Sequence, residues 1–108
     1  MTARELLNRL PDVLDSEAAG DTSAVIEYRL AEPMHQVLAG GTLQTIDGPA
    51  PAPDVTVAMR DDDLVALFRG ELSPMVAFMT GRLRITGDVG LAQRLVTLFD
   101  QEGLRSLG

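Results

Sequence analysis

The apolar residues of this chain change their spacing partway along it, and this change constrains the fold more than any other feature. Between Ala24 and Met59, large apolar side chains tend to recur at every second residue, which is the period of a β-strand. From Leu64 onward most of them recur every three or four residues, the period of a helix that covers an apolar surface. Strands followed mainly by helices are typical of the α+β class.

Turn residues separate four predicted strands in this first part. Gly40-Gly41 suits the positive φ angles of a two-residue hairpin turn, which would set Leu38 opposite Leu43. The run from Gly48 to Pro53 predicts a stiff extended loop, because each proline fixes its own φ. The four strands are expected at 24–30, 35–39, 42–46 and 55–59.

Helix signals lie on both sides of these strands. Thr2-Ala3-Arg4-Glu5 has the form of a capping box, and Pro11 is expected to end or kink that first helix. The predicted order is therefore α-β-β-β-β-α-α-β-α, a five-stranded, mainly antiparallel sheet with helices packed on one face. The later elements are expected to be helices starting at Asp61, at Ser73-Pro74 and at Asp88, with a strand at 82–86 before the last helix, which bears Leu91, Leu95, Leu98 and Phe99.

The charge of the chain argues against several partners. Nucleic acid binding needs clustered lysine and arginine, whereas this chain has nine arginines spread singly, no lysine and a net charge of −7. An acidic domain is also repelled by anionic membrane surfaces, so at most transient membrane contact is expected. No apolar run reaches the ~20 residues of a membrane-spanning helix, and the N-terminus has no signal-peptide pattern, so we expect a cytoplasmic location.

No set of side chains has the pattern of a catalytic or metal site. The chain has no cysteine and one histidine, His35, whereas zinc sites take several such ligands. The acidic run Asp61-Asp62-Asp63 could be read as a cation site. Its place before an amphipathic helix instead predicts capping of free N–H groups and a favourable interaction with the helix dipole. We therefore expect no enzyme activity, no cofactor and no metal.

The segment from Leu67 to Asp88 is similar to the signature of sterol carrier protein type 2 (SCP2) domains. In that family a glycine ends one helix, and a short helix rich in Met, Ala and Phe follows, as at 75–79. A Gly-basic-Leu-basic-Ile strand then leads to Gly-Asp, as at 81–88. Upstream, Pro53–Val57 looks like the family's entry to its fourth strand, so the resemblance covers roughly 25–100.

This resemblance implies a single SCP2-like domain over residues 1–108, with an apolar cavity between sheet and helices. Family members bind sterols, fatty acids or acyl-CoA without catalysis, and related domains serve quinone biosynthesis. The tripeptide 106–108 is not the peroxisomal targeting signal of eukaryotic carriers, so we expect a bacterial, single-domain member. Carried over by position, the ligand would contact Leu64, Phe68, Met75, Phe78, Met79, Leu91, Leu95 and Phe99.

Periodicity alone fits the same residues as an ordinary core. A rigid empty cavity of about 400 Å³ would cost on the order of 10 kcal/mol, which rivals the ~5–15 kcal/mol stability of a small domain. The pocket is thus expected to be filled by ligand, collapsed, or covered by a partner chain. Our leading hypothesis is a non-catalytic carrier of a lipid-like ligand (sterol, fatty acid, acyl-CoA or isoprenoid). The alternative is an interaction module that docks a second copy or an enzyme of lipid or quinone metabolism.

Overall fold

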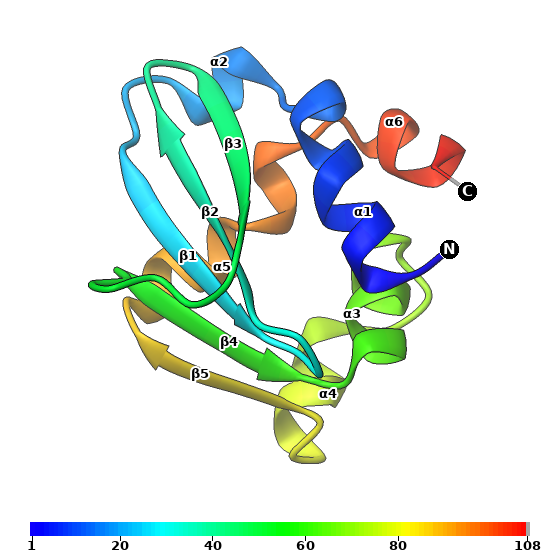
Figure 1. Ribbon diagram of the computed structural model, residues 1–108. Coiled ribbons are helices and arrows are strands. Elements are labelled where there is room, and N and C mark those ends of the chain that lie inside the picture. The colour runs from blue at the N-terminus through cyan, green and yellow to red at the C-terminus, as the bar shows by residue number, and fades with distance from the viewer. Residues whose placement is uncertain (108) are drawn as a thin grey trace.

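Five strands form one mixed, mostly antiparallel sheet, which confirms the predicted α+β class (Figure 1). The computed structural model describes residues 1–107, and Gly108, the last residue of the C-terminal tripeptide, lies outside the described residues. The strand order is β3-β2-β1-β4-β5, with β1 and β4 parallel and the other neighbours antiparallel. The strands are β1 (Ala24–Arg29), β2 (Met34–Ala39), β3 (Thr42–Asp47), β4 (Val55–Met59) and β5 (Leu83–Gly87).

The helices gather on one side of this sheet, and none within residues 1–107 is long and apolar enough to cross a membrane (Figure 1). Half of the predicted capping box is confirmed, because the Thr2 hydroxyl accepts a hydrogen bond from the Glu5 backbone N–H at 3.1 Å. The Glu5 carboxylate accepts from the Thr2 hydroxyl at 3.1 Å. The helical elements are α1 (Ala3–Arg9), η1 (Leu10–Val13), α2 (Ser16–Ala19), α3 (Asp61–Phe68), α4 (Pro74–Met79), α5 (Val89–Arg94), η2 (Val96–Leu98) and α6 (Gln101–Ser106).

The last predicted helix is wrong in its extent. The chain leaves helical geometry after Leu98, and Phe99 is extended and forms an isolated bridge with Leu14. Backbone hydrogen bonds to the neighbouring segment replace the helical ones, since Asp100 N donates to Val13 O at 2.8 Å. The helix α6 that follows was not predicted from the sequence.

The β2–β3 hairpin has the predicted turn and register. Gly40 and Gly41 both adopt positive φ, and Leu38 pairs with Leu43. This register places alternate residues of every strand on the helix side of the sheet. Those on β1, β2 and β4 are Ala24, Ile26, Tyr28, Met34, Gln36, Leu38, Val55, Val57 and Met59, all of them buried.

The proline-rich loop between β3 and β4 crosses the other face of the sheet, so that β4 pairs with β1 rather than with β3 (Figure 1). Two buried polar side chains hold this loop. The Glu27 carboxylate accepts a hydrogen bond from Ala50 N at 2.9 Å, and the His35 ring Nδ1 lies 2.9 Å from the Gly48 carbonyl oxygen. In this structure His35 therefore fastens a loop.

Candidate functional site

The eight predicted ligand contacts fall into two groups that lie in different places. Five are buried in the apolar cluster between sheet and helices: Leu64, Phe68, Leu91, Leu95 and Phe99. The other three lie on α4 and are exposed, with 72% of Met75, 58% of Phe78 and 78% of Met79 accessible to solvent. The structure therefore does not bring all eight together around one cavity.

The buried group comes from three segments of the second half of the chain. Leu64 and Phe68 lie one turn apart on α3, and Leu91 lies on α5. The Phe68 and Phe99 rings meet edge to face, with centroids 5.8 Å apart and planes at 74°. These aromatic and aliphatic side chains offer an apolar ligand a surface without charge.

This interior is closely packed in the described structure. A void wide enough for an acyl chain would leave the side chains around it accessible to a water molecule. Leu64 has no accessible surface, Phe68 has 2% and Phe99 has 3%. Of the three states considered for the pocket, the described residues therefore match the collapsed one.

A polar network crosses the interior between the sheet and the end of α1. The Tyr28 hydroxyl donates to Gln36 Oε1 at 2.8 Å, and Gln36 Nε2 donates to the Leu7 carbonyl oxygen at 3.1 Å. The Thr45 hydroxyl donates to the same carbonyl at 2.8 Å. Burial raises the pKa of Tyr28 far above its usual value, so this hydroxyl remains neutral. Sequence reasoning missed this network, because a lone glutamine in a strand carries no signal of burial.

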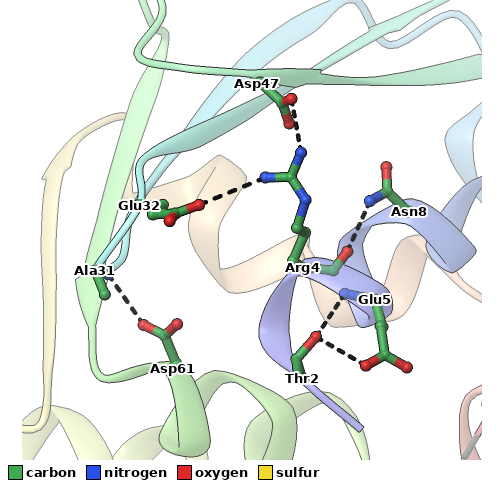
Figure 2. Close-up of polar contacts among 8 residues, drawn as sticks. All are labelled: Thr2, Arg4, Glu5, Asn8, Ala31, Glu32, Asp47 and Asp61. Carbon is green, nitrogen blue, oxygen red and sulfur yellow. Dashed lines mark hydrogen bonds and ion pairs between the residues drawn. The ribbon is translucent and has the colours of Figure 1, made fainter.

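Ion pairs near its N-terminal end link α1 to the end of β3 and to the β1–β2 connection (Figure 2). The Arg4 guanidinium donates to Asp47 at 2.7 Å and lies 3.8 Å from the Glu32 carboxylate. All three side chains are at least half exposed, so each pair contributes little to stability. Their effect is to position α1, which closes the interior on this side.

The acidic run at the start of α3 does not cap that helix, and the capping prediction is wrong in this respect. Asp61 accepts a hydrogen bond from Ala31 N at 3.0 Å in the β1–β2 connection (Figure 2). Asp63 accepts from Arg82 at 2.7 and 3.3 Å, which ties α3 to the turn between α4 and β5. These partners are distant in sequence and out-compete the local N–H groups. Among residues 1–107, no three acidic or histidine side chains gather as a metal site.

The pair between Asp63 and Arg82 predicts a pH-dependent stability. Hydrogen bonds from Arg82 hold the pKa of the Asp63 carboxyl below its ordinary value of 3.8, against an opposing effect of burial. A lowered folded pKa stabilises the fold above the unfolded pKa, and this contribution disappears as the pH falls through the folded value. Urea unfolding of wild type and Asp63→Asn should therefore differ at pH 7, with the variant less stable, and the difference should shrink as the pH falls below 3.8 and through the lower folded value. A difference that stayed the same from pH 7 into this acidic range would contradict this origin.

Two shallow depressions open on the surface. The larger, of about 710 Å³, lies at the end of β4 beside the turn that follows α4, and it contains none of the eight predicted contacts. Its lining includes Arg60, Arg82 and Arg84 together with Asp61 and Asp62. The second, of about 550 Å³, touches the buried group only at Phe99.

The sheet with helices on one side, the uncharged apolar interior and the signature around α4 define an SCP2-type domain, and the chain belongs to the SCP-2 sterol transfer family, whose model matches residues 3–100. Hydroxysteroid dehydrogenase-like protein 2 of Mus musculus is 33% identical over 111 residues, covering 94% of this chain and 22% of that protein. Sterol carrier protein 2 of Homo sapiens is 46% identical over 50 residues, covering 46% of this chain and 9% of that protein. The chain thus spans only a small part of these relatives.

Solved structures share the fold at low sequence identity. The sec-alkylsulfatase Pisa1 from Pseudomonas sp. superposes with a TM-score of 0.78 at 21% identity, over 84% of this chain and 15% of that enzyme. Palmitated sterol carrier protein 2-like 2 from Aedes aegypti gives a TM-score of 0.70 at 20% identity, over 90% and 93%. The ubiquinone synthesis protein UbiJ gives 0.64 at 21% identity, over 86% and 82%.

Proposed function

We propose that this domain binds a lipid-like apolar ligand between its sheet and its helices and performs no chemistry on it. The observation that carries the proposal is the buried apolar cluster between sheet and helices in a chain that belongs to the SCP-2 sterol transfer family. The walls of the occupied site would be the five buried members of the predicted set: Leu64, Phe68, Leu91, Leu95 and Phe99.

The relatives support a ligand of this kind. One structure of the same fold, the Aedes aegypti protein, carries palmitate, and another relative is a sterol carrier protein. An acyl chain, a sterol or an isoprenoid tail would be compatible with walls made only of carbon and hydrogen. Because the inward side chains of β1 and β4 carry no charge, a carboxylate or phosphate head should stay at the surface, where water solvates it.

The packed interior adds a requirement to this proposal. A ligand must displace side chains that are now in contact, so binding couples to a movement of the helices that cover the sheet. The edge-to-face contact between Phe68 and Phe99 is the point that has to open, because it joins α3 to the segment after η2. Ligand binding should then stabilise the fold in proportion to the logarithm of the free ligand concentration.

Native mass spectrometry on protein purified without detergent tests the proposal. We expect an adduct of a few hundred daltons that extracts into organic solvent as a lipid, or uptake of a fluorescent fatty acid by protein stripped of its ligand. Bound ligand should raise the free energy of unfolding by about 2.7 kcal/mol at a free ligand concentration one hundred times Kd. A clean apo mass together with no uptake would contradict lipid binding.

A second candidate function is an interaction module that acts as one part of a larger assembly. It is favoured by the packed interior and by the small share of each longer relative that the chain covers, 22% of the mouse protein and 15% of Pisa1. In this case the domain would pair with a second copy or with an enzyme of lipid or quinone metabolism. Sedimentation velocity over a range of protein concentrations would show a concentration-dependent dimer if the second copy is the partner.

A further inference from the structure

Helix α4 presents an unusual surface, because nearly all of its side chains are apolar and exposed. Only Ala77 is buried, with no accessible surface, while Met75, Phe78 and Met79 are more than half exposed and Val76 is half exposed. We call these four exposed side chains the α4 patch. Figure 1 shows α4 at one end of the molecule, beside the start of β5 and away from both termini. The patch therefore faces solvent in the described fold.

The patch is held in this position by an ordered framework. The Ser73 hydroxyl caps α4 by accepting from Val76 N, and the Arg82 backbone N–H donates to the Ala77 carbonyl at 2.9 Å. The ion pair between Arg82 and Asp63 ties the same turn to α3. These specific contacts hold apolar side chains in a position exposed to water. Exposure of apolar surface is unfavourable unless another molecule covers it.

The net charge of the chain argues against a second copy as the occupant of the patch. Each of the four side chains exposes on the order of 100 Å², so the patch measures roughly 400 Å². Two copies of a chain with net charge −7 would repel each other at such a contact. A zwitterionic bilayer surface carries no net charge, and apolar side chains can enter it without a matching shape.

The charges around the patch also fit a phospholipid surface. From Leu72 to Gly87 the only charged side chains are Arg82 and Arg84, and the sixteen acidic residues all lie outside this segment. Both arginines also line the 710 Å³ depression beside α4 together with Asp61 and Asp62. Arg82 is paired with Asp63, so Arg84 is the arginine left to meet a phosphate. Arginine side chains at the edge of an inserted apolar group can reach lipid phosphates while their stems stay in apolar surroundings. An overall acidic protein is not repelled by a zwitterionic surface as it is by an anionic one.

We propose that α4 docks this domain on a phospholipid bilayer, with the α4 patch in the outer layer of the membrane and Arg84 at the level of the phosphates. The inference rests on the proposed function, because a carrier of an apolar ligand has to collect and deliver it at a membrane. It assigns Met75, Phe78 and Met79 to the membrane contact and leaves the ligand walls to the five buried residues.

Sedimentation with phosphatidylcholine vesicles tests the docking surface. The test variant is Met75→Gln with Phe78→Gln and Met79→Gln, and the matched control is Ile46→Gln with Val89→Gln, two exposed apolar residues on β3 and at the start of α5. Wild type and control should pellet with the vesicles to within about twofold of each other. The test variant should partition at least tenfold less, while its circular dichroism spectrum stays the same because the altered side chains are exposed.

Three results would overturn the inference. One is wild-type protein that does not pellet with phosphatidylcholine vesicles, and another is a test variant that pellets as well as wild type. The third is a wild-type dimer in sedimentation velocity that the test variant converts to a monomer, since the patch would then be covered by a second copy. Uptake of a fluorescent fatty acid from solution is measured in parallel. A wild-type protein that binds vesicles but takes up no fatty acid would contradict the proposed function and would still support the docking surface.

Discussion

Alanine in place of Gly87 is expected to lower the free energy of unfolding by about 2–6 kcal/mol. Gly87 ends β5 with φ +97°, and a Cβ atom there would lie 2.5 Å from the Asp54 carbonyl oxygen and 3.2 Å from Val55 Cα. The carbonyl cannot retreat freely, because it accepts a hydrogen bond from Asp88 N at 2.9 Å. The strained backbone costs about 1–3 kcal/mol, and the displacement of a neighbouring strand adds a similar amount. Urea unfolding followed by circular dichroism measures the loss.

Gly81→Ala provides the matched control for this prediction. Gly81 also has a positive φ, +76°, but no atom lies within 4 Å of the place its Cβ would take. Alanine there carries only the backbone strain, about 1–2 kcal/mol. Equal losses in the two variants would show that the close approach between β5 and the start of β4 has no energetic effect.

Local features of the sequence predicted the parts of the fold that local chemistry decides. The Gly40-Gly41 turn fixes the register of β2 and β3, and Thr2 and Ser73 cap their helices as expected. The position of β4 beside β1 was beyond this reasoning, because it depends on a loop that crosses the sheet and on contacts of Glu27 and His35 distant in sequence. The partners of Asp61 and Asp63 were missed for the same reason.

Sequence periodicity could not separate the buried from the exposed members of the candidate site. On α3, five apolar residues follow one another from Leu64 to Phe68, and the fold buries Leu64, Leu67 and Phe68. On α4, five apolar residues follow one another from Met75 to Met79, and no side of the helix is distinguished. Only the fold decides that the smallest of them, Ala77, packs inward while the larger ones face outward. The resemblance to the SCP2 family placed both groups in one pocket, because it concerned residue types and not the orientation of α4.

Phe68→Ala should have the second large effect, a loss of about 3–5 kcal/mol in the free energy of unfolding. Phe68 is 2% exposed, and its removal leaves a cavity next to Phe99 as well as the lost transfer energy of the ring. Phe78→Ala is the matched control, since the same substitution at a side chain that is 58% exposed should change stability by no more than about 0.5 kcal/mol. Equal losses at the two positions would contradict the division of the predicted site into an interior and a surface group.

The same pair of variants connects stability to the proposed ligand. If the interior takes up an apolar chain, the cavity in Phe68→Ala gives that chain room without the cost of separating Phe68 from Phe99. A fatty acid should then raise the thermal midpoint of Phe68→Ala by more than it raises that of wild type, while Phe78→Ala should respond as wild type does. A ligand that stabilised all three proteins equally would bind somewhere other than this interior, because only an interior site can sense the missing ring.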